Sequence, residues 1–142
     1  MKKRVLGGFL AVLMLSASLC TVAAAPAPHA SLYLDGYGVG VRAKGNCKMA
    51  VTYVVFGTDI MDKLGAQTIL VEEWDGTEWV KTGTYSATKN TSFYATDVSE
   101  HAGTVYFYGL PGINYRATLT AYAELDGGSD TGTVTSDPET CY

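Results

Sequence analysis

Two histidines, His29 and His101, are the only side chains whose ordinary pKa lies near neutrality. We expect His101 to lie in a solvated loop over residues 99–103. A serine hydrolase needs such a histidine between a nucleophile and an orienting carboxylate. The chain has no Gly-x-Ser-x-Gly turn to present a serine. The sequence therefore predicts that the protein is not an enzyme, with a small hydrolase as the weakest alternative.

Carboxylates gather around one expected hairpin, at Glu72, Glu73, Asp75 and Glu78. Two carboxylates about 5–10 Å apart can hydrolyse a glycosidic bond. Acidic side chains also coat turns for solubility, and we expect that role here. The segment 126–130, Asp-Gly-Gly-Ser-Asp, lacks the spaced acids and final Glu of a calcium loop. It predicts a plain hairpin turn, with a calcium site as the alternative.

The sequence predicts no cofactor and no resident metal. It contains no phosphate-binding loop, dinucleotide fingerprint or Cys-x-x-Cys. The sequence Asn90-Thr91-Ser92 is formally a glycosylation acceptor. We expect it to be unmodified.

Aromatic side chains are the more informative group. The candidates for binding are Trp74, Trp79, Tyr106, Tyr108 and Tyr122. If Val105 and Phe107 face the core of a sheet, Tyr106 and Tyr108 face solvent. An exposed aromatic strip can stack on sugar rings or anchor a protein partner. The alternative is that aromatic residues are present simply because they form strands well.

These side chains require a scaffold of short strands. After residue 30, β-branched and aromatic residues come in short runs between turn residues, with no long helical period. The predicted strands are 31–34 continuing as 38–43, then 48–56, 67–74, 77–85, 92–96, 104–108, 114–124 and 130–136. Residues 57–66 are the exception and predict one helical turn or a folded loop, with Ile60, Met61 and Leu64 closing one end of the fold.

The strand over residues 114–124 has the clearest pattern. Tyr115, Ala117 and Leu119 point one way, and Arg116 and Thr118 point the other. A half-buried antiparallel strand shows that alternation, and two such sheets bury their apolar faces against each other. The fold class is therefore predicted to be all-β, a two-sheet antiparallel β-sandwich of seven or eight strands over residues 31–142.

The segment 110–117, Leu-Pro-Gly-Ile-Asn-Tyr-Arg-Ala, followed by Leu119 and Ala121, resembles the E–F corner of fibronectin type III domains. That family reads Leu-x-Pro-Gly-Thr-x-Tyr, and Ile113 stands where Thr is usual. The resemblance implies a fibronectin type III or immunoglobulin-like sandwich in which the Tyr115 hydroxyl bonds back to the backbone. It implies nothing about function.

The layout as a whole resembles a family of small exported Gram-positive bacterial proteins, classed as a domain of unknown function. The matching residues are Gly36 to Gly40, Trp79, Tyr115-Arg116 and Gly127-Gly128-Ser129. No established activity accompanies this resemblance, so it supplies no catalytic residues.

The N-terminus resembles a secretory signal peptide. Lys2, Lys3 and Arg4 precede an apolar run from Val5 to about Leu19, and small residues follow. We expect cleavage after Ala24 or Ala25, followed by a flexible lead-in over 26–30. A retained anchor is one alternative, although about 15 apolar residues are short for a membrane span. Lipidation of Cys20 is another, although Leu19 is larger than the residue that usually precedes a lipidated cysteine.

Cleavage would change both charge and cysteine count. Seven basic residues would face fourteen acidic ones, a net charge of −7, which disfavours binding to nucleic acid or an anionic membrane. Cys47 and Cys141 would remain, and an exported protein with two cysteines favours one disulfide over free or intermolecular thiols. In a fibronectin-like strand order, both cysteines would lie at the same end of the sandwich.

These observations predict a secreted, non-catalytic module that stays out of the membrane after cleavage. We expect it to bind a protein, a glycan or a cell surface. The alternative is a structural subunit that pairs through exposed strand edges.

Overall fold

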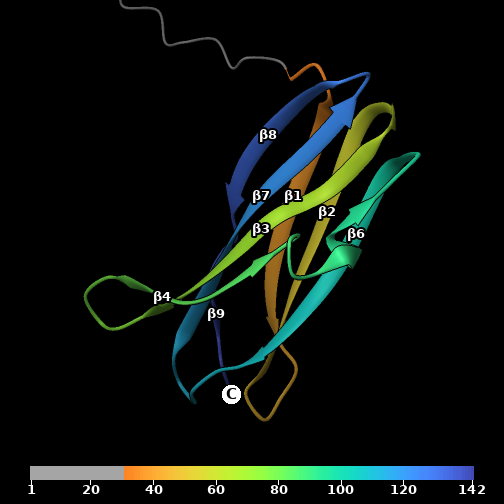
Figure 1. Ribbon diagram of the computed structural model, residues 1–142. Helices are drawn as coiled ribbons and strands as arrows, with labels where there is room; N and C mark the ends of the chain where they lie inside the picture. The colour runs from red at the N-terminus through yellow and green to blue at the C-terminus, as the bar shows by residue number, and fades with distance from the viewer. Residues whose placement is uncertain (1–30) are drawn as a thin grey trace, which may run out of the picture.

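The computed structural model describes residues 31–142. The predicted signal peptide over 1–25 and lead-in over 26–30, with Cys20 and His29, lie outside the described residues. The described chain forms two antiparallel sheets packed face to face (Figure 1). The predicted all-β sandwich is therefore confirmed, and the described part of the chain has nine strands.

The first sheet has three strands in the order β1-β2-β6. They are β1 (Leu34–Ala43), β2 (Lys48–Met61) and β6 (Val98–Tyr108). The register aligns Val41 with Val51, and Val51 with Val105, in one row across the sheet. The side chains of this row face the second sheet, and that of Val51 is fully buried.

The second sheet has the order β4-β3-β7-β8. Its long strands are β3 (Lys63–Trp74), β4 (Trp79–Ser86), β7 (Asn114–Leu125) and β8 (Gly128–Thr135). A 3-10 turn (Thr91–Phe93) precedes the short strand β5 (Tyr94–Ala95), which pairs with β3. The final strand β9 (Glu139–Thr140) pairs with β7.

The core follows the alternation predicted for β7. Tyr115, Ala117, Leu119, Ala121 and Ala123 are all buried. Their partners across the sandwich include the fully buried Met49, Val51 and Val55 of β2. The buried residues of β7 include three small alanines, whereas these residues of β2 in the other sheet are larger, which lets the two sheets approach closely.

The helical turn or loop predicted for residues 57–66 is wrong, because β2 continues to Met61 and β3 begins at Lys63. The ladder between β2 and β6 shifts register between Phe56 and Met61, so the extra residues bulge outward. Met61 and Leu64 are fully buried and do close one end of the sandwich. Ile60 does not, because its side chain points out of the bulge and is 61% exposed.

The solvated loop predicted for residues 99–103 is also wrong, since β6 runs without a break from Val98 to Tyr108. Gly103, within that segment, is a glycine because a Cβ atom there would lie 2.5 Å from the Tyr53 hydroxyl oxygen. The residue leaves room for Tyr53 inside the sandwich.

The predicted bridge between Cys47 and Cys141 is confirmed, with Cα atoms 5.0 Å apart. The Cys47 amide donates to the Tyr142 carbonyl at 3.0 Å, and its carbonyl accepts from the Gly109 amide at 2.9 Å. This residue therefore ties together the β1–β2 turn, the β6–β7 loop and the C-terminus.

Candidate functional site

Tyr115 forms the corner that the sequence predicted at the start of β7. Its hydroxyl oxygen accepts a hydrogen bond from the Leu110 amide at 2.9 Å and donates to Glu73 Oε2 at 3.3 Å. Gly109 leaves room for the ring, because a Cβ atom there would lie 2.6 Å from Tyr115 Cε2. Burial is the main cause of the raised pKa of Tyr115.

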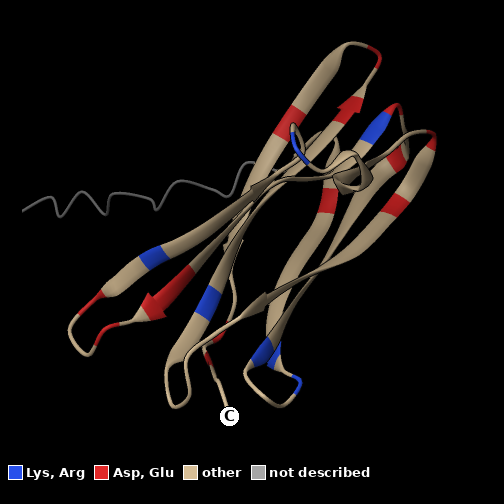
Figure 2. Ribbon diagram, turned by 60° about the horizontal axis from the view of Figure 1, so that its bottom comes forward, with Lys and Arg blue, Asp and Glu red and all other residues tan. Residues whose placement is uncertain are grey.

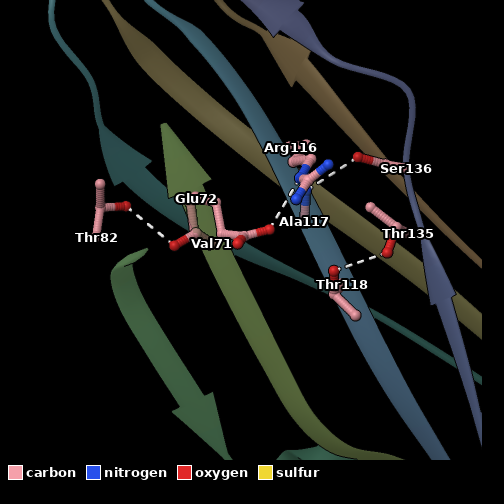
Figure 3. A network of polar contacts seen from close by, with 8 residues as sticks. All are labelled: Val71, Glu72, Thr82, Arg116, Ala117, Thr118, Thr135 and Ser136. Carbon is pink, nitrogen blue, oxygen red and sulfur yellow. Dashed lines mark hydrogen bonds and ion pairs between the residues drawn. The ribbon is translucent and has the colours of Figure 1, made fainter. Parts of the chain in front are cut away.

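The four carboxylates of the β3–β4 hairpin do not converge as a catalytic pair would. Glu72 and Glu73 are neighbours on a strand, so their side chains point to opposite faces. Glu72 binds Arg116 at 2.8 Å on the outer face (Figure 3). Asp75 Oδ1 accepts from the Glu78 and Thr77 amides, which lowers the pKa of Asp75. These contacts fold and cap the hairpin.

Polar side chains of β7, β8 and the residue after β8 bond to one another and to the backbone at the four-stranded sheet. Thr118 and Thr135 share a hydrogen bond across β7 and β8, and Ser136 Oγ accepts from the Ala117 amide (Figure 3). Charged residues gather mainly near strand ends and turns (Figure 2). Between these charged ends, the outer face presents the hydroxyl pair of Thr118 and Thr135.

Trp74 and Trp79 do not form a flat exposed platform. Their rings are 5.4 Å apart and tilted by 57°. The Arg116 guanidinium lies 4.4 Å from the centre of the Trp79 ring. Both residues are only partly exposed, and they contact each other within the hairpin and Arg116 of β7.

Tyr122 lies apart from the β6 tyrosines, because β7 belongs to the other sheet. Its ring packs against Tyr94 at 5.5 Å, and its hydroxyl donates to Glu124 at 2.5 Å. That bond to Glu124 is the main cause of the raised pKa of Tyr122. The five candidate aromatics are thus divided among three places in the fold.

His101 faces the interior from β6. Its Nε2 lies 3.3 Å from the Tyr53 hydroxyl and 2.9 Å from the Ser92 carbonyl oxygen. Neither partner is a serine hydroxyl or a carboxylate, so this geometry does not assemble a hydrolytic triad. Burial raises the pKa of Tyr53 to about 12.

The acidic segment 126–130 closes the predicted β7–β8 hairpin. Asp130 Oδ2 accepts from Ser31 Oγ at 2.7 Å and from the Leu32 amide at 2.9 Å, so this carboxylate fixes the start of the described chain. The bond from Ser31 is the main cause of the lowered pKa of Asp130. Among residues 31–142, no three His, Cys, Asp or Glu side chains are grouped to hold a metal ion.

Tyr106 and Tyr108 face solvent from β6 as predicted. They are 54% and 74% exposed, whereas Val105 and Phe107 point inward and pack against the core. The Lys48 ammonium lies 4.6 Å from the centre of the Tyr106 ring. We call Tyr106 and Tyr108 the β6 strip. Leu110, 62% exposed, continues the apolar surface into the next loop.

A groove beside the β6 strip was not foreseen from the sequence. It has a volume of about 200 Å³ and lies between β4 and the end of β6, lined by Val71, Glu73, Tyr85, Phe107, Tyr108 and Tyr115 among others. Small-molecule sites usually measure about 300–1,000 Å³, so the groove suits one side chain. Its residues come from four strands, and no local sequence signal joins them.

No protein-family model, curated protein or solved structure matches the chain. Membership of the exported Gram-positive family therefore stays a prediction. In the described range 31–142, no helix has the length and apolar character needed to cross a membrane.

Proposed function

We propose that the protein is an exported, non-catalytic module of fibronectin type III-like fold that binds another protein through the β6 strip. The single observation that carries the proposal is the exposure of Tyr106 and Tyr108 on one strand. Tyrosine offers a large contact area and a hydroxyl group, and it is enriched at the centres of protein interfaces. Leu110 extends the same surface.

Export is supported by the N-terminal residues and by the bridge between Cys47 and Cys141, since disulfides persist mainly in oxidising compartments. The fold assignment is supported by the contact between Tyr115 and the Leu110 amide at the start of β7.

A protein partner is favoured over a glycan because the tryptophan rings contact other side chains of the protein. Sugar binding commonly uses an aromatic ring with a free flat face, and Trp79 has its face against Arg116. The neighbouring Trp74 is tilted against Trp79. Lys48 lies over Tyr106 in the same way, but both tyrosines of the β6 strip are more exposed than either tryptophan, and Tyr108 is the more exposed of the two.

Photocrosslinking tests this function. A benzophenone side chain would replace Tyr108 in one variant and Thr84, exposed on β4 of the other sheet, in a second. In the extracellular fraction of the producing organism, we expect a protein adduct from position 108 and none from position 84. Equal labelling, or none, at both positions contradicts the proposal. Binding on a glycan array that is lost on Tyr108→Ser would replace the protein partner by a glycan.

A further inference from the structure

We propose that the free edge of β6 and the groove beside it bind an extended segment of a partner protein, which places a Lys or Arg side chain against Glu73. The proposal rests on the proposed function and names the chemistry of its partner. Strand addition of this kind gives affinity through backbone hydrogen bonds and specificity through alternate side chains.

The first step is that β6 has one unpaired side. The Gly109 amide donates to the Cys47 carbonyl, which continues the β2–β6 ladder. The backbone N–H and C=O groups of successive residues point to alternate sides of a strand. Those of the odd-numbered residues from 101 to 107 therefore bond to β2. Those of Ala102, Thr104 and Tyr106 point to the free side. The Tyr85 hydroxyl of β4 donates to the Tyr106 carbonyl oxygen at 3.4 Å, and this contact agrees with the assignment. Within residues 31–142, β6 pairs with no strand other than β2.

The second step is that this edge lacks the usual protection. Natural edge strands carry lysines, prolines or bulges that discourage pairing. Between Glu100 and Pro111 the chain has no charged residue and no proline. The ladder with β2 is also regular from Lys48 to Phe56. An added strand would find a regular template over Ala102 and Thr104, and at Tyr106 it would share the carbonyl oxygen with the Tyr85 hydroxyl.

The third step is the charge in the groove. Glu73 is half-buried, and its carboxylate accepts a hydrogen bond from Tyr115 at 3.3 Å. Its neighbour Glu72 has Arg116 as a cation, but among residues 31–142 no ion pair involves Glu73. A partly desolvated carboxylate is stabilised by a cation close to it. A Lys or Arg side chain therefore complements this groove, and a Glu or Asp side chain does not.

The alternation of a strand joins these features in one site. An added strand would point successive side chains to opposite faces. One set would enter the groove beside Phe107 and reach Glu73. The other set would lie next to Tyr106 and Tyr108 on the outer face. A single extended segment with an alternating pattern would therefore use both the groove and the β6 strip.

The test uses short capped peptides and the purified domain over residues 26–142 with its disulfide intact. The probe is Thr-Val-Thr-Lys-Thr-Val-Thr, and in its matched partner Gln replaces Lys. Binding is measured from amide chemical shifts in NMR spectra. We expect the Lys peptide to shift the amides of Ala102, Thr104 and Tyr106, and to bind about tenfold more tightly than the Gln peptide.

Two pairs of variants test whether Glu73 causes the preference for Lys and whether the free edge of β6 binds the peptide. Glu73→Gln should abolish the preference for Lys, whereas Glu78→Gln, on the exposed tip of the same hairpin, should keep it. Thr104→Pro removes an amide that faces the free edge and should prevent binding of both peptides. Thr104→Val keeps that amide and should bind both. Dispersed spectra of each variant verify that it is folded.

The proposal is overturned if neither peptide shifts the β6 amides of the wild-type domain, or if both bind it equally. If crosslinking at position 108 still captures a protein in that case, strand addition fails while the proposed function stands. If crosslinking at position 108 also fails, both are wrong.

Discussion

Strands β6 and β7 follow each other in the chain and carry the same alternating pattern, but they have different neighbours. Strand β7 lies between β3 and β8, and its inward residues are all buried. Within residues 31–142, strand β6 pairs with β2 alone, which leaves one of its backbone edges free, and its outward side chains Tyr106 and Tyr108 lie in solvent. The comparison teaches that position in the sheet, and not residue pattern, separates a strand that stabilises the fold from one available for binding.

The tyrosines of the two strands show the same contrast. Tyr115 is buried against Phe107, with ring centres 5.2 Å apart, and its hydroxyl joins two other segments. Tyr108 lies one residue beyond Phe107 and faces solvent. If the comparison is right, changes on β7 and its attachments should affect stability, and changes on the β6 strip should affect binding.

The largest expected loss of stability comes from removing the disulfide that attaches the C-terminus beside β7. Replacing both Cys47 and Cys141 by Ala removes a bridge across 94 residues. The free energy of unfolding should fall by about 4 kcal/mol because the unfolded chain gains freedom. Urea denaturation measures the loss, and adding a reductant to the wild type should reproduce it. An unchanged midpoint would show that the bridge contributes little.

The next effect compares the two strands directly. Leu119→Ala opens a cavity on the fully buried face of β7 and should cost about 3 kcal/mol. Tyr106→Ala on β6 should cost less than about 1 kcal/mol, since that side chain is mostly exposed. Denaturant titrations of both variants provide the measurement. Equal losses would break the distinction between the strands.

A smaller effect is expected at the corner of β7. Tyr115→Phe removes the hydroxyl that accepts from Leu110 and donates to Glu73, and should cost about 1–2 kcal/mol. Tyr108→Phe is the matched control and should leave the unfolding midpoint unchanged. The role assigned to the corner is rejected if the two variants are equally stable.

The smallest effect on stability at neutral pH is expected at Tyr53 of β2, whose hydroxyl lies against Gly103 of β6. Burial raises the pKa of Tyr53 to about 12, above the usual tyrosine value of about 10, so the folded protein retains a phenol proton that the unfolded chain releases. Its contribution to stability is complete below about pH 10 and is lost as pH rises toward about 12. Unfolding free energies measured across that range should fall less steeply for Tyr53→Phe. A parallel decline in both proteins would exclude this origin.

Local patterns in the sequence predicted most of the fold. The alternation in β7, the turn residues Gly76 and Gly127 and the cysteine pair were all interpreted correctly, because each depends on a few neighbouring residues. The failures came where tertiary contact overrides a local signal. Gly103 lies in a segment predicted as a loop but leaves space for Tyr53 inside the sandwich, and residues 57–66 belong to two long strands where a helical turn or loop was predicted.

The candidate site was only half foreseen. Tyr106 and Tyr108 could be assigned to solvent, because alternation with Val105 and Phe107 determines their face. The sequence could not indicate that Arg116 covers Trp79, or that Glu73 lines a groove next to β6. Those contacts join residues that are distant in the chain, and their register depends on how both sheets pack.

The sequence by itself determined the class of fold, the sulfur bridge and the outward face of the β6 tyrosines. These follow from the period of two along a strand and from the chemistry of single residues. Only the tertiary structure decided that β6 is an edge strand within residues 31–142, that Glu73 in the neighbouring groove has no ion pair in that range, and that Arg116 lies over Trp79. The physical reason is that a strand's own residues fix which way its side chains point, whereas its neighbours are fixed by the packing of the whole chain.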